Sequence, residues 1–119
     1  ASSVVQLDLA RAEARAGAAR AFLLDELATA WDLAVAGDPV PLDRRARIRM
    51  ACAHAATESA AAVDAAYDLG GGSSVFTSSP LQRCFRDVHT ATQHIMVSRR
   101  PMETVGKLLL GLEADTGML

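Results

Sequence analysis

Two long stretches without proline dominate this chain. Residues 3–36 contain no proline and a single glycine. The apolar residues in the second half of this stretch recur at helical spacing: Leu24, Leu27, Ala28, Trp31 and Ala34. Proline would interrupt the hydrogen bonds of a helix, so this pattern predicts one long amphipathic helix. It ends before Gly37, Pro39 and Pro41, which cannot continue it.

A second helix is expected from near Asp43 to Leu69, with Gly70 as a suitable C-terminal cap. Its apolar positions keep helical phase and are mostly small: Ile48, Ala51, Cys52, Ala55, Ala62, Ala66 and Leu69. Small side chains allow two helix backbones to approach closely. The pattern therefore predicts a closely packed pair of long helices.

Composition supports an all-α fold in one domain. The chain has 119 residues, of which 50% are hydrophobic and 4% aromatic, and β-branched residues are sparse beside alanine. The formal net charge is −2 with scattered basic residues, so nucleic acid is not expected as a partner. There is no secretory signal pattern and no apolar run approaching the ~20 residues of a membrane span, so we expect a soluble, cytoplasmic protein.

A glycine loop leads into a third helix. Gly70, Gly71 and Gly72 permit positive φ angles and close backbone approach. Ser79 is expected to cap the next helix, with Pro80 at its first position and Gln82 completing a capping box. The free N–H groups at such a helix start suit an anionic or polar ligand.

The third helix, expected from about Pro80 to Ser98, has two different faces. The apolar stripe consists of Leu81, Phe85, Val88, Thr92 and Ile95. The opposite stripe consists of Arg83, Asp87, Thr90 and His94, which could bind a ligand or form a polar network between subunits. After Pro101, a short final helix carries a dense apolar face made of Val105, Leu108, Leu109 and Leu112, which predicts self-association.

Other chemistries lack their sequence context. A hydrolase triad could be assembled from Ser73 or Ser74, His89 or His94, and Asp87, but no Gly-x-Ser-x-Gly elbow occurs. The three glycines follow a helix rather than a strand, which argues against a dinucleotide fingerprint. His54 and Glu58 lie four residues apart without a second Glu-x-x-His partner, so no metal site is predicted.

Three motifs carry a family resemblance: LGGGSS at residues 69–74, SPLQRCFRDVHTATQH at 79–94 and VGKLLLGL at 105–112. They closely resemble the C-terminal helical domain of flavin monooxygenases related to acyl-CoA dehydrogenases, such as dibenzothiophene monooxygenase and the oxygenase component of 4-hydroxyphenylacetate hydroxylase. The resemblance covers nearly the whole chain, residues 1–119, and is most specific in the second half. It implies a four-helix up-and-down bundle that forms homodimers or homotetramers.

The same resemblance implies a cofactor, a partner and site residues. Members of the family use FAD or FMN, reduced by a separate flavin reductase, to oxygenate aromatic or heteroaromatic substrates. Gly71, Gly72 and Ser73 would then contact the flavin of a neighbouring subunit. His94 would face the reacting edge, where a histidine can donate a hydrogen bond to activated oxygen or accept a phenolic proton.

Two alternatives stay open. In several acyl-CoA dehydrogenases the catalytic glutamate follows an Arg-Asp pair, nine residues after the arginine, whereas Ile95 stands there in this chain after Arg86-Asp87. A true dehydrogenase is thus disfavoured without being excluded. The family's N-terminal and middle domains are absent from the sequence, so the chain alone is expected neither to retain flavin nor to turn over substrate. A non-catalytic helical association module is the other alternative.

Overall fold

The computed structural model describes residues 2–119. In this part of the chain there are four α-helices, two short 3₁₀ turns and no strand. The elements in order are α1 (Ser3–Val35), α2 (Leu42–Leu69), η1 (Gly71–Val75), α3 (Pro80–Thr92), η2 (Ile95–Val97) and α4 (Arg99–Leu109). The predicted all-α class with four helices is confirmed.

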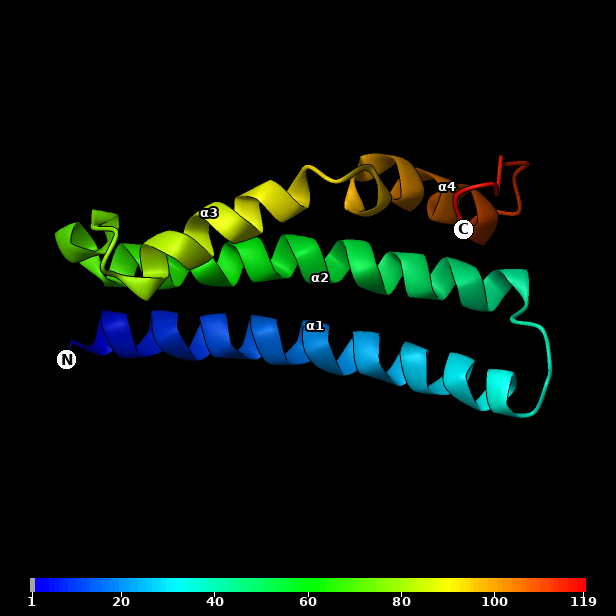
Figure 1. Cartoon of the computed structure of the whole chain (residues 1–119), viewed down its shortest axis with the longest axis horizontal. Coiled ribbons are helices and arrows are strands. Elements are labelled where there is room, and N and C mark those ends of the chain that lie inside the picture. The colour runs from blue at the N-terminus through cyan, green and yellow to red at the C-terminus, as the bar shows by residue number, and fades with distance from the viewer. Residues whose placement is uncertain (1) are drawn as a thin grey trace.

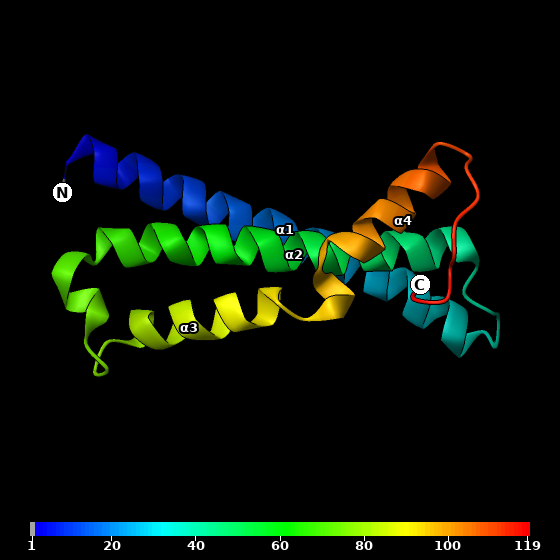
Figure 2. The ribbon, with the colours of Figure 1, turned by 90° about the horizontal axis from the view of Figure 1, so that it is seen from above.

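Helix α2 is the centre of the bundle. It lies between α1 and α3 in both ribbon views, and α1, α3 and α4 all pack against it (Figures 1 and 2). The first three helices alternate in direction. Helix α4 follows α3 on the same side of α2 (Figure 1) and crosses the first half of α2 obliquely (Figure 2). The result is an elongated bundle of 49 × 26 × 26 Å.

Alanines line the seam between α1 and α2. Ala12 and Ala19 of α1 are buried. In α2, Ala51 is buried on the side that faces α1, whereas Ala46 and Ala53 are buried on the side that faces α4. Because an alanine side chain is only a methyl group, the two helices approach closely over most of their length. The expected close packing of the two long helices is confirmed.

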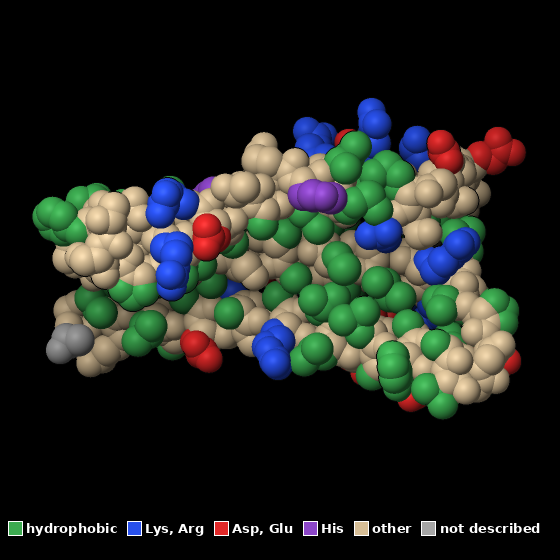
Figure 3. Space-filling model, viewed as in Figure 1, with side chains coloured by type: hydrophobic (Ala, Val, Ile, Leu, Met, Phe, Trp, Pro, Cys, Tyr) green, Lys and Arg blue, Asp and Glu red, His purple; other side chains and the backbone are tan. Residues whose placement is uncertain are grey.

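Large apolar side chains remain uncovered at the end of the bundle where α1 meets α2. Trp31 and Val35 of α1 are 71% and 72% exposed, and Leu109 and Leu110 near the end of α4 are 75% and 76% exposed. Figure 3 shows hydrophobic side chains spread over the second half of α1. Within the expected apolar face of the final helix, Val105 is buried and Leu108 is half-buried, whereas Leu109 and Leu112 are exposed and the described residues do not cover them. Leu112 lies beyond the end of α4 at Leu109, so the prediction that it belongs to this helix is wrong.

No helix among the described residues is both long enough and apolar enough to cross a membrane.

Candidate functional site

The glycine loop needs its glycines for different reasons. Gly70 caps α2 with a φ of −71°, and within the loop only Gly71, at 59°, has a positive φ. A Cβ at Gly70 would collide with Ser74 Oγ and lie 2.9 Å from Leu81 Cδ1, whereas one at Gly72 would meet nothing within 4 Å. Gly70 therefore permits close packing, Gly71 permits the turn, and Gly72 leaves open space.

Two serines fasten this loop to the end of α2. Ser73 Oγ donates to the Gly70 carbonyl at 2.7 Å, and Ser74 Oγ donates to the Tyr67 carbonyl at 2.8 Å. Ser74 is fully buried, while the neighbouring Gly71, Gly72 and Ser73 are exposed. These bonds satisfy carbonyls that the helix end leaves free. The loop thus presents the three predicted flavin contacts together on a fastened turn.

Helix α3 begins as expected, except for its capping box. Ser79 Oγ accepts a hydrogen bond from the Leu81 N–H at 3.3 Å, and Pro80 occupies the first helical position. The Ser79 N–H donates to the Phe76 carbonyl at 2.9 Å, and Gln82 Oε1 is buried without a hydrogen-bond partner. The predicted reciprocal bond from Gln82 is therefore wrong, because the loop carbonyl occupies the donor it required.

A histidine–aspartate contact joins α2 to α3. His89 Nε2 lies 2.6 Å from Asp64 Oδ1. The His89 ring packs on Phe85 at 4.5 Å between centroids, and Phe85 packs on Tyr67 at 4.6 Å. The sequence interpretation missed this pair, because its two residues are remote in sequence and meet only through the register of the two helices.

Helix α3 ends earlier than the sequence pattern predicts. It stops at Thr92 rather than near Ser98, so His94 does not share a helical face with Arg83, Asp87 and Thr90. Two threonine hydroxyls donate to helix carbonyls near this end, from Thr90 to Arg86 at 2.8 Å and from Thr92 to His89 at 2.7 Å. Such bonds compete with regular helix bonding and weaken the last turn.

His94 instead begins the short turn η2. Its backbone is extended, with φ −68° and ψ 133°, and its Nδ1 accepts a hydrogen bond from the Met96 N–H at 3.1 Å. A neutral imidazole that accepts through Nδ1 carries its proton on Nε2. The exposed side chain of His94 therefore has an Nε2–H donor to offer. Ile95 next to it is 54% exposed, so it does not belong to the buried side of α3 as predicted.

The glycine loop and His94 lie beyond opposite ends of α3. This helix has 13 residues, which at about 1.5 Å per residue separates its ends by ~20 Å. A single small group cannot touch both places. They can contact distant parts of an extended cofactor, or two separate ligands.

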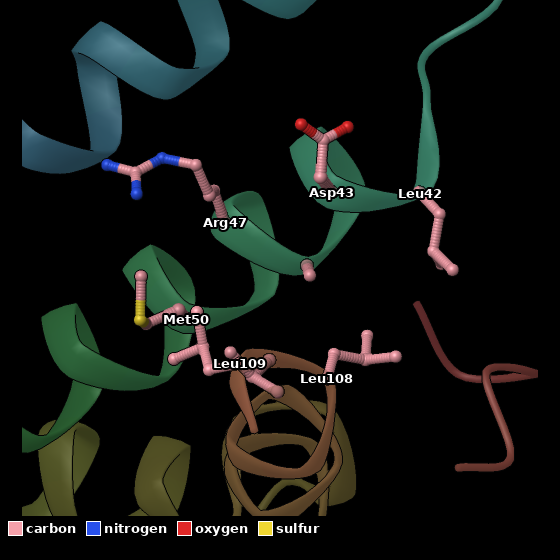
Figure 4. Close-up of a pocket in the computed structure, with 8 residues that line it drawn as sticks. Leu42, Asp43, Arg47, Met50, Leu108 and Leu109 are labelled. Carbon is pink, nitrogen blue, oxygen red and sulfur yellow. The ribbon is translucent and has the colours of Figure 1, made fainter. Parts of the chain in front are cut away.

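The apolar hollow at the other end of the bundle involves none of the predicted site residues. It encloses about 430 Å³ between the start of α2 and α4 (Figure 4). Leu42, Met50, Leu108 and Leu109 contribute side chains to it, while the Arg47 guanidinium turns toward α1 (Figure 4).

Within residues 2–119, no three histidine, cysteine, aspartate or glutamate side chains gather as they would around a metal ion.

Comparison with known protein families identifies the family of this chain. The family model described as the acyl-CoA dehydrogenase C-terminal domain matches residues 1–99. The chain belongs to this family. The family resemblance inferred from the sequence motifs is thereby confirmed, and the matched residues include α1, α2 and α3.

The curated relatives of this acyl-CoA dehydrogenase C-terminal domain include monooxygenases. Indole-3-acetate monooxygenase of Pseudomonas putida is 34% identical over 116 residues, covering 98% of this chain and 30% of the relative. The flavin-dependent monooxygenase oxygenase subunit HsaA of Mycobacterium tuberculosis is 29% identical over 72 residues, covering 60% of this chain and 18% of the relative. The chain therefore spans less than a third of the length of these relatives.

A solved structure shows the same fold. The 3-HSA hydroxylase from Rhodococcus sp. RHA1 superposes with a TM-score of 0.91 at 28% identity, covering 99% of this chain and 31% of that protein. The fold predicted from the sequence, that of an acyl-CoA dehydrogenase C-terminal domain, is thus confirmed in three dimensions.

Proposed function

We propose that this domain belongs to a flavin-dependent monooxygenase of aromatic substrates, called the parent protein below. The observation that carries the proposal is the 34% identity to an indole-3-acetate monooxygenase along 98% of the chain. Ile95 stands where several acyl-CoA dehydrogenases place a glutamate, so this position offers no carboxylate base for dehydrogenation.

The glycine loop fits a flavin contact. Gly72 leaves open space where a side chain would stand, and Gly71, Gly72 and Ser73 are exposed. Backbone N–H groups and a hydroxyl on such a loop suit the phosphate or ribityl oxygens of FAD or FMN. Flavin, when bound and reduced, supplies the activation of oxygen. A single loop offers few contacts, so the 119-residue chain alone does not retain the cofactor.

His94 is the proposed catalytic residue. Its Nδ1 is engaged with the Met96 N–H, which leaves the Nε2–H of this exposed side chain available as a donor. A donor held in this way stabilises negative charge on an oxygen in the reacting region. Of the two roles considered for His94, the geometry favours donation of a hydrogen bond over acceptance of a phenolic proton.

The parent protein is also proposed to associate with copies of itself and to depend on a flavin reductase. The exposed apolar residues of α1 and of the α4 end are buried in a homodimer or homotetramer, because contiguous apolar surface favours association. A separate flavin reductase supplies the reduced cofactor.

The test uses the parent protein with a flavin reductase and ¹⁸O₂. We expect one labelled oxygen atom in an aromatic product such as that of indole-3-acetate, measured by mass spectrometry. Dehydrogenation of an acyl-CoA without incorporation of label would overturn the proposal.

A further inference from the structure

A second hollow lies directly beside the His94 turn. It encloses about 330 Å³ between α2, η2 and α4. Its lining consists of Ala53, Thr57, Val97, Ser98, Arg99, Met102 and Glu103. This volume is within the range of pockets that hold small organic ligands.

His94 and one wall of this hollow form a single hydrogen-bonded turn. The Val97 N–H donates to the His94 carbonyl at 3.1 Å, and the His94 ring accepts from the Met96 N–H at 3.1 Å. Ser98 Oγ donates to the Ile95 carbonyl at 2.7 Å. Val97 and Ser98, which line the hollow, are thus tied by hydrogen bonds to the turn that carries His94. A ligand held against them therefore lies at a defined position relative to His94.

The lining combines an apolar part with a cation. Ala53, Val97 and Met102 supply apolar surface for a ring. Arg99 borders the hollow, and because its side chain is 94% exposed, its guanidinium stands in solvent at the rim, where it can reach a ligand. Its contact with Glu103 is 3.5 Å long, and the Glu103 side chain is 62% exposed, so this pair contributes little and is easily exchanged.

We propose that Arg99 determines specificity by binding the carboxylate of an aromatic-acid substrate whose ring occupies this hollow beside His94. The inference rests on the proposed function, and an arylacetate such as indole-3-acetate has both parts. A guanidinium binds a carboxylate through two parallel hydrogen bonds, a geometry that Glu103 does not make with Arg99 here. The substrate carboxylate replaces Glu103 as the partner of Arg99.

The test compares Arg99→Met with Arg100→Met in the parent protein. Arg100 is the exposed neighbouring arginine on α4 and does not line the hollow. For indole-3-acetate, Arg99→Met should raise KM and the equilibrium Kd about 10- to 100-fold, the effect expected for a lost charge-assisted hydrogen-bond pair, with kcat changed less than about twofold. For the uncharged indole-3-acetamide neither value should change, and Arg100→Met should leave both ligands unaffected.

Other outcomes overturn the inference. Equal losses of affinity for the acid and the amide would assign Arg99 a structural role, and an unchanged Kd for the acid would remove Arg99 from recognition. Direct binding, followed by titration calorimetry, does not depend on turnover. If the parent protein binds indole-3-acetate through Arg99 but inserts no oxygen, the proposed function fails while the assignment of Arg99 stands.

Discussion

Arg47 Nε lies 2.6 Å from Glu26 Oε1, across the seam between α2 and α1. Glu26 is 2% exposed, whereas Arg47 and Arg44, the latter 3.5 Å from Oε2, both reach solvent. Oε2 has no hydrogen-bond partner, so the Arg44 contact is an ion pair rather than a hydrogen bond. A buried carboxylate held by two half-exposed cations fixes the pairing of the two long helices.

Replacing Glu26 by alanine should lower the free energy of unfolding by about 1–3 kcal/mol. This loss lies at the lower end of the range for breaking a buried ion pair, because both arginines can point their charges into solvent once the carboxylate is removed. Urea unfolding followed by circular dichroism measures it. Glu103→Ala, which removes an exposed pair, should change stability by less than about 0.5 kcal/mol. Equal effects of the two substitutions would contradict this role of Glu26.

The three glycines of the loop should differ when each is changed to alanine. Gly71→Ala should cost about 1–2 kcal/mol because its φ of 59° is unfavourable for a residue with a Cβ. Gly70→Ala should also destabilise, since its Cβ meets Ser74 and Leu81. Gly72→Ala should be nearly neutral. Denaturant titration gives the order, and a Gly72→Ala cost equal to that of Gly71→Ala would rule out this account of the loop.

The exposed apolar end of the bundle predicts association of the 119-residue chain. Sedimentation velocity should show at least a dimer, and Leu109→Glu combined with Leu110→Glu should shift it to monomer, because charge is then placed in a buried contact. Lys107→Glu is the matched control on the exposed side of the same helix and should leave the assembly intact. A wild-type chain that stays monomeric at high concentration would refute the prediction.

Features set by nearby residues could be predicted from the sequence. The expected first helix, residues 3–36, differs from α1 by one residue at its end, because Gly37 and Pro39 stop any helix there. Ser79 and Pro80 likewise mark the start of α3 through local capping chemistry. The motifs also sufficed to identify the family, since their residue order is specific.

Features that depend on competing hydrogen bonds or on the register between helices could not be predicted from the sequence. No glycine or proline marks the end of α3, so the helical period predicts a helix to about Ser98, whereas it ends at Thr92. Threonine side-chain bonds and the His94 ring favour a different backbone there. The Asp64–His89 and Glu26–Arg47 contacts depend on how neighbouring helices slide past each other, which the pattern of a single helix does not contain.

The most direct measurement of the central claim is product formed per reduced flavin consumed by the parent protein carrying His94→Ala. We expect a loss of at least about 100-fold, with flavin binding unchanged, because the Nε2–H donor is removed. His94→Gln retains a side-chain N–H donor and should recover part of the yield. An unchanged product yield in His94→Ala, with flavin still bound, would contradict the claim that His94 acts at the reacting centre.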